Sequence, residues 1–204
     1  MPATEAAILR GAPLPQSFFD RNAEEVARDL LGAILVSSLG GDGVTAGRIV
    51  ETEAYPGPHD PASHAAERIG RTARNASMFG APGTAYVYRI YGLHWCLNVV
   101  TGAEGYPAAV LIRALEPLVG IEIMRRRRNG RPDRELASGP GRLTEALAIT
   151  GAHDRRPLDR PPLLLLPGRP VDPRDTVAGP RIGVSRAADW PLRFYVRGSE
   201  WVSR

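Results

Sequence analysis

The chain contains no lysine, and all 26 of its basic residues are arginine. Catalysis through a lysine Schiff base and phosphate binding by a Walker-type loop both need a lysine amine, so the sequence excludes them. The only remaining amine is the N-terminal one, which belongs to Pro2 if Met1 is removed.

Cysteine and long apolar runs are also scarce. Cys96 is the single cysteine, which excludes an intrachain disulfide and is typical of a reducing compartment. The first 16 residues lack the apolar segment of a secretory signal, and no apolar run approaches the about 20 residues that span a bilayer. We therefore expect a cytoplasmic protein without a membrane partner.

Motifs for metals and nucleophiles are missing as well. The four histidines show no HxxxH or HExxH spacing, and no GxSxG turn occurs. We expect neither a metal nor another cofactor, although Glu53 and Asp60 keep a magnesium-dependent enzyme open on composition alone.

The composition that is present favours one folded domain. The chain has 204 residues, of which 43% are apolar, and a formal net charge of +4. The abundance of arginine has two readings. A biased genome replaces lysine with arginine, or the arginines form a surface that binds phosphates.

Local patterns predict both helices and strands. The expected helices cover residues 18–31, with Asn22 as a cap, 118–128 and 142–149. The expected strands cover residues 33–39, 45–55, 85–91, 93–101, 108–115 and 193–196. Residues 56–83 form a long loop, of a length that is often functional, and 155–174 are expected to be irregular chain. The six arginines in 124–134 indicate a solvated segment that could face phosphates.

These elements show no alternation of strand, helix and strand. We therefore predict an α+β fold, with helices around a curved, mainly antiparallel sheet and a protruding β-hairpin. Residues 1–16 are expected to be a flexible arm, and residues 17–204 a single domain.

The strand at 48–55 (RIVETEAY) carries two carboxylates. The period of two places Ile49, Glu51, Glu53 and Tyr55 on one face. Such a face is either the wet side of an edge strand or a site. The sequence gives Glu51 no role of its own, and we expect Glu51→Gln to be mild.

The next two strands contain several tyrosines. Tyr86 and Tyr88 share a face, and Tyr91 falls beside Gly92 at the expected turn. The β-propensity of tyrosine explains the first two equally well. An exposed aromatic residue at a hairpin tip is less usual, and one use for it is a wedge between stacked bases.

Taken together, these segments resemble the alkyladenine-type 3-methyladenine DNA glycosylases. The resemblance extends from about residue 49 to 202. It rests on the strand at 48–55, Gly57-Pro58, His64, Met78-Phe79, Pro82-Gly83-Thr84, Tyr86-Val-Tyr88, Ile90-Tyr-Gly92, Cys96, Asn98, Arg113-Ala-Leu-Glu-Pro117, Ser138-Gly-Pro140 and residues 191–199 (PLRFYVRGS).

The resemblance implies a role for each matching residue. Glu53 corresponds to the general base that activates water, and Arg113 to the arginine that helps to hold this water. The pocket walls correspond to Tyr55, His64 and Tyr88, with the His64 backbone amide offered to the flipped base. Asn98 corresponds to the floor residue that discriminates against the amino group of guanine, and Tyr91 to the intercalating residue.

Each role has a structural alternative. Arg113 could simply pair with Glu116 or another carboxylate, His64 could be a solvent-facing loop residue, and Asn98 could bond to a neighbouring turn. Leu93 and His94 depart from the wedge-like Met-Tyr pair of mammalian relatives, which affects the grip on flanking bases.

The implied activity is that of a monofunctional glycosylase in base excision repair. Such an enzyme flips a damaged purine from double-stranded DNA and hydrolyses its N-glycosidic bond. We expect it to act as a monomer near the nucleoid. Two alternatives stay open: a metal-dependent nuclease that uses Glu51, Glu53 and Asp60, and a non-catalytic nucleic-acid-binding module whose tyrosines stack on bases.

Overall fold

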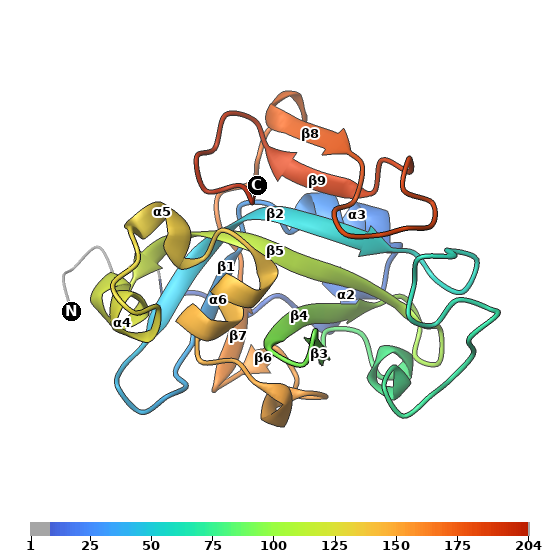
Figure 1. Ribbon diagram of the computed structural model, residues 1–204, viewed down its shortest axis with the longest axis horizontal. Helices are drawn as coiled ribbons and strands as arrows, with labels where there is room; N and C mark the ends of the chain where they lie inside the picture. The colour runs from blue at the N-terminus through green and yellow to red at the C-terminus, as the bar shows by residue number, and fades with distance from the viewer. Residues whose placement is uncertain (1–8, 204) are drawn as a thin grey trace.

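Nine strands form one antiparallel sheet in the computed structural model, which describes residues 9–203. The main path runs β3-β4-β5-β2-β1-β7-β6, and β9 pairs with both β2 and β8. Figure 1 shows β2 and β5 as long, curved strands through the middle of the molecule. The predicted α+β class is confirmed. The strands are β1 (Ile34–Ser37), β2 (Thr45–Tyr55), β3 (Ala85–Ile90), β4 (His94–Thr101), β5 (Ala108–Val119), β6 (Asp159–Arg160), β7 (Leu163–Leu166), β8 (Thr176–Gly179) and β9 (Arg193–Val196).

Short helices pack around this sheet. In the view of Figure 1, α3 lies behind β2 and β5, and α6 lies in front. No helix within residues 9–203 is long and apolar enough to cross a bilayer. The helices are α2 (Gln16–Phe19), α3 (Ala23–Asp29), α4 (Ile121–Arg127), α5 (Asp133–Leu136) and α6 (Pro140–Ala146), with 3₁₀ turns η1 (Ala76–Phe79), η2 (Gly151–His153) and η3 (Pro173–Asp175).

Strand alternation divides the sheet into an apolar face and a polar face. The Thr52 hydroxyl donates to the Ala27 carbonyl of α3 at 2.8 Å, so Glu51 and Glu53 point away from α3. The apolar face of β2–β5 contributes to the main core. The opposite face therefore carries the candidate site.

Part of the polar face is covered by the long loop of residues 56–83. Ala65 and Met78 from this loop pack on Tyr86, Val100 and Ala109 in a small separate apolar cluster. The loop thus becomes a wall beside the sheet.

The predicted shared face of β2 is wrong for Ile49. Ile49 packs in the main core with Ala54, and the register between β2 and β5 shifts between Ile49 and Thr52. An irregularity of this kind adds a residue to one strand and reverses the alternation beyond it. Only Glu51, Glu53 and Tyr55 share the polar face.

Two helix predictions need correction. The expected helix at 18–31 is divided into α2 and α3, although Asn22 does cap α3 by accepting the Glu24 N–H at 2.8 Å. The helix expected from residue 118 begins at Ile121, because β5 continues to Val119 and ends at Gly120 in a left-handed conformation.

The segment 155–174, expected to be irregular, contains β6 and β7. Leu163 and Leu165 of β7 are fully buried, and β7 pairs with β1. The expected flexible arm also ends earlier than residue 16. Leu14 donates its N–H to Leu165 at 2.8 Å and packs in the main core. Residues 1–8 of that arm lie outside the described residues.

Candidate active site

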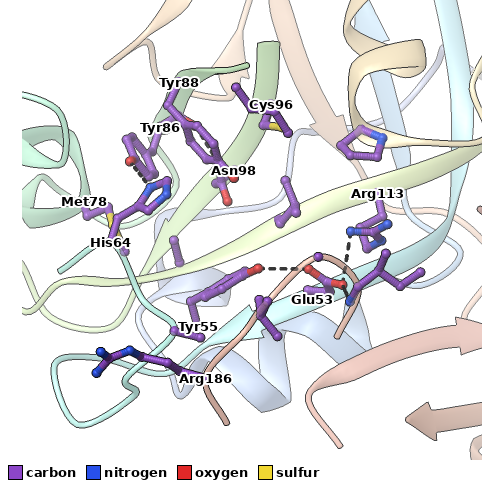
Figure 2. A pocket seen from close by; sticks show the side chains of 18 of the residues that line it. Glu53, Tyr55, His64, Met78, Tyr86, Tyr88, Cys96, Asn98, Arg113 and Arg186 are labelled. Carbon is purple, nitrogen blue, oxygen red and sulfur yellow. Dashed lines mark hydrogen bonds and ion pairs between the residues drawn. The ribbon is translucent and has the colours of Figure 1, made fainter. Parts of the chain in front are cut away.

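A cavity of about 390 Å³ lies over the polar face of the sheet. Strands β2, β3, β4 and β5 form its base, and the loop 56–83 and residues 182–186 form its sides. In Figure 2, Tyr55 and Glu53 lie across the cavity from His64, Tyr86 and Tyr88. The structure thus brings together the six residues predicted for catalysis and the pocket, which are Glu53, Tyr55, His64, Tyr88, Asn98 and Arg113.

Glu53 is fully buried at the base of the cavity. Its Oε1 forms an ion pair with Arg113 Nη1 at 3.1 Å and accepts the Ile182 N–H at 2.7 Å, and its Oε2 accepts from the Tyr55 hydroxyl at 3.0 Å. A carboxylate has about four lone-pair sites, so these partners do not use up its capacity to accept hydrogen bonds.

Burial is the largest influence on the Glu53 carboxyl group. It raises the pKa of Glu53 above the usual 4.5, although the Arg113 charge and the Ile182 and Tyr55 hydrogen bonds act in the opposite direction. Burial and the neighbouring Glu53 charge also raise the pKa of Tyr55 well above 10. Tyr55 therefore remains a neutral donor to Glu53.

Arg113 contacts both carboxylates of β2. Its Nη1 reaches Glu53, and its Nε donates to Glu51 at 3.0 Å. The alternative partner Glu116 is instead paired with Arg48 at 2.7 Å. Arg113 therefore pairs with other carboxylates rather than with Glu116. One of these carboxylates, Glu53, is the predicted base.

Glu51 is tightly held by neighbouring side chains. It is fully buried and accepts hydrogen bonds from Arg113, Arg193 and Ser203. Removing its charge would leave buried arginines short of a partner, which is costly. This overturns the reason for expecting Glu51→Gln to be mild.

The aromatic side of the cavity is built around His64. Its ring meets the Tyr88 ring edge-on, with centroids 4.5 Å apart, and its Nδ1 lies 2.8 Å from the Tyr86 hydroxyl. The His64 carbonyl accepts from Asn75 Nδ2 at 2.8 Å, which anchors the loop. His64 is thus a fixed wall residue rather than a solvent-facing one.

The aromatic wall is uncharged. Burial, with a smaller contribution from the Arg74 charge, lowers the pKa of His64 to about 4. Burial raises the pKa of Tyr88 well above 10. At neutral pH the cavity therefore presents neutral ring faces, which attract a cationic ligand.

Asn98 lies on β4, buried at the floor of the cavity. Its Nδ2 donates to the carbonyl of Tyr86, its cross-strand partner, at 3.0 Å. Asn98 therefore bonds to the neighbouring strand β3 and not to a turn. This hydrogen bond fixes the orientation of the Asn98 amide.

The predicted hairpin joins β3 and β4 at Tyr91 and Gly92. The two residues have φ values of 52° and 66°, and the Leu93 N–H donates to Ile90 at 3.1 Å, which defines a type I′ turn. Asn and Gly are the usual residues of this turn, so a tyrosine in the left-handed region is strained. Tyr91 is also 84% exposed, and its side chain is therefore not part of the core.

Two sets of arginines bear on phosphate binding. Three arginines in α4 or at its C-terminal end are paired with acidic residues: Arg125 with Asp133 at 2.5 Å, Arg127 with Asp42, and Arg128 with Glu145. The side chains of Arg126, Arg131 and Arg134 are 62–63% exposed, so the segment is solvated as predicted, and its phosphate-facing role stays a prediction. Three other arginines, Arg68, Arg74 and Arg186, are exposed and line the cavity.

The carboxylates named for the nuclease alternative are each bound by arginine. Arg181 makes a two-pronged ion pair with the fully buried Asp60, and Arg113 contacts Glu51 and Glu53. Positive charges in these positions repel a divalent cation. Within residues 9–203, no group of three or more metal-ligating side chains comes together.

Several residues of the site were missed from the sequence. Ile182 donates its backbone N–H to Glu53, and Arg181 places its guanidinium 4.7 Å from the Tyr55 ring centroid. Nothing in the local pattern of 180–186 identifies this segment, because its partners lie more than 120 residues away. The pairing of Tyr86 with His64 could have been inferred from the shared face of Tyr86 and Tyr88.

Comparison with known proteins identifies the family. Residues 17–200 match the family model described as Methylpurine-DNA glycosylase. A relative from Rhodopseudomonas palustris (strain HaA2) is 53% identical over 95% of this chain and 91% of its own length. Relatives from Methanoculleus marisnigri (51%, covering 94% and 98%) and Myxococcus xanthus (52%, covering 94% and 93%) are similar to the same extent. All three carry the name 3-methyladenine DNA glycosylase.

A family match of this length defines a class of enzyme, the DNA glycosylases of DNA repair. The chain belongs to the methylpurine-DNA glycosylase family. Its substrate is DNA, and the resemblance noted from the sequence is confirmed.

Proposed function

We propose that the protein flips an alkylated or deaminated purine, of the 3-methyladenine or hypoxanthine type, out of duplex DNA. Glu53 then activates a water molecule that hydrolyses the N-glycosidic bond and leaves an abasic site. The observation that carries the proposal is a buried glutamate, held by Arg113, Ile182 and Tyr55, at the base of an aromatic cavity. The cavity volume of about 390 Å³ suits a small planar ligand.

Recognition begins with charge. An N-alkylated purine carries a positive charge, and each good contact with an aromatic face is worth about 0.5–2 kcal/mol. The neutral rings of Tyr55, His64 and Tyr88 supply such faces. A protonated His64 would repel the same base, so its lowered pKa supports this role.

Asn98 is proposed to reject guanine. Its amide is held by the Tyr86 carbonyl, so it cannot freely turn to suit a different base. A buried polar group left without a partner costs about 1–3 kcal/mol, which is enough to disfavour the extra amino group of guanine.

The chemical step uses the charges at the cavity base. The positive base is already a good leaving group, and Glu53 directs water to the anomeric carbon and stabilises the positive charge that develops there. Arg113 keeps the Glu53 carboxylate in one orientation through its Nη1 contact.

DNA is held by the hairpin and the rim. Tyr91 is proposed to fill the gap left by the flipped nucleotide. Arg68, Arg74 and Arg186 surround the opening and suit the flanking phosphates. A single copy supplies all these groups, so we propose that it acts as a monomer.

The product is proposed to be an intact strand with an abasic site. Strand cleavage through an imine needs an amine nucleophile, and the chain contains no lysine. Only a processed N-terminus at Pro2 could substitute.

The test is release of free base from methylated duplex DNA and from a hypoxanthine duplex, in EDTA, followed by strand analysis and borohydride trapping. The proposal predicts free base, an unbroken strand and no trapped complex. Magnesium-dependent strand cleavage would support the nuclease alternative, and binding without base release would support the binding module. A trapped complex that disappears when an N-terminal tag blocks Pro2 would show that the enzyme is bifunctional.

A further inference from the structure

Ser203 lies behind the catalytic pair, in the segment that follows β9. It is buried, and its N–H donates to Glu51 Oε2 at 2.6 Å while its hydroxyl donates to Glu51 Oε1 at 2.8 Å. Both oxygens of Glu51 are thus held by one serine that is 152 residues away in the sequence.

The same hydroxyl also contacts Arg113. Arg113 Nη2 donates to Ser203 Oγ at 3.2 Å, Nε donates to Glu51 Oε1 at 3.0 Å, and Nη1 reaches Glu53 at 3.1 Å. All three nitrogens of this planar group have partners. Because the guanidinium is rigid, partners on Nε and Nη2 fix the direction of Nη1.

A second arginine completes the cluster. Arg193 Nε donates to Glu51 Oε1 at 2.6 Å, and its Nη2 donates to the Ser203 carbonyl at 3.4 Å. Two arginines therefore face two glutamates, and the buried charges balance. Glu51 consequently serves as the anchor of Arg113, whereas Glu53 faces the cavity.

We propose that Ser203 is a positioning residue that, with Glu51, orients Arg113 toward the Glu53 carboxylate. The inference rests on the proposed function, because it assumes that Glu53 is the base. Ser203 does not line the cavity, so it acts on the reaction only through Arg113.

Ser203→Ala isolates this role. The change removes the hydroxyl contacts to Glu51 and Arg113 but keeps the backbone N–H and carbonyl contacts. A small displacement of a group in an active site costs up to about 100-fold in rate. We expect the single-turnover rate of base release to fall about 10- to 100-fold.

Three further readouts separate positioning from folding. The affinity for lesion DNA should stay within the error of the wild type, because the cavity loses no contact. The melting temperature should fall measurably, because the buried Arg113 Nη2 and Glu51 Oε1 each lose a hydroxyl partner, while the variant stays folded at the assay temperature. The NMR signal of the Arg113 Nε–H should shift. The matched control is Ser199→Ala, in the same segment, whose hydroxyl accepts only the Trp201 N–H at 3.3 Å; it should change none of these quantities.

An unchanged rate in Ser203→Ala would overturn the inference, and so would a loss of rate no larger than the loss of DNA affinity or of folded protein at the assay temperature. If the wild-type protein releases no base at all, the proposed function fails instead. The Arg113 Nε–H signal still reports in that case whether Ser203 orients this guanidinium.

Discussion

Replacing Tyr91 by asparagine should make the protein more stable and a poorer enzyme. Tyr91 occupies the first central position of a type I′ turn with φ 52°, a conformation that asparagine tolerates well. A left-handed conformation costs an ordinary residue about 1–2 kcal/mol. Tyr91 is 84% exposed, so its removal forfeits almost no core packing.

The size of both effects can be worked out. In a domain of this size, each 1 kcal/mol of stability moves the melting temperature by about 2–4 °C, so relief of about 1–2 kcal/mol of strain should make Tyr91→Asn melt about 2–8 °C higher. Stacking of one base on an aromatic side chain is worth about 1–3 kcal/mol, so lesion binding should weaken about 5- to 150-fold. If Tyr91 acts as a wedge between bases, we expect it to be retained although it lowers the stability of the fold.

The assay compares thermal melting, lesion-DNA affinity and single-turnover base release. Release should suffer more for a well-paired lesion than for the same lesion in a mispair, where unstacking is already cheap. Tyr91→Phe is the matched control, since it keeps both the ring and the strain, and it should resemble the wild type. A lower melting temperature for Tyr91→Asn, with equal loss on paired and mispaired lesions, would refute the reasoning.

Three other outcomes follow from the site. The rate of base release should fall as the pH drops through the raised pKa of Glu53, because only the carboxylate accepts a proton. His64, with its pKa of about 4, stays mostly neutral above pH 4.5; a pH-independent rate down to pH 4.5 would contradict the assignment of Glu53. Arg186→Gln should weaken DNA binding and reduce the salt slope by about 1, whereas Arg131→Gln, away from the cavity, should not. Asn98→Ala should increase release of undamaged guanine, measured on unmodified DNA; unchanged release would mean that Asn98 does not select the base.

The local parts of the fold could be predicted from the sequence. The alternation along 45–55 and 85–101 and the turn at Gly92 are short-range signals, and they correctly gave β2, the hairpin and the exposed position of Tyr91. The predicted position of Ile49 is wrong because the register of β2 shifts beside it, and the alternation of residue types along the sequence does not reveal such a shift.

The long-range parts could not be predicted from pattern alone. The roles of Glu53 and Arg113 came from resemblance, since nothing local separates Glu53 from Glu51. Their partners Ile182 and Ser203 lie more than 120 residues from β2. The pairing of Arg127 with Asp42 and of Arg128 with Glu145 could not be seen in the arginine run at 124–134, because these acidic partners lie outside it in the sequence.

The most direct test of the account is single-turnover base release by Glu53→Gln. The amide can keep its oxygen toward Arg113 and the Ile182 N–H and donate its nitrogen to the Tyr55 hydroxyl, so the variant should fold and bind lesion DNA. It cannot act as a base.

General-base catalysis contributes about 100- to 10,000-fold, and the rate should fall by this factor. Glu116→Gln is the matched control, because Glu116 lies on β5, pairs with Arg48 and does not line the cavity. The account predicts that Glu53→Gln binds the lesion but releases almost no base, whereas Glu116→Gln is fully active. Base release by Glu53→Gln within tenfold of the wild-type rate would contradict it.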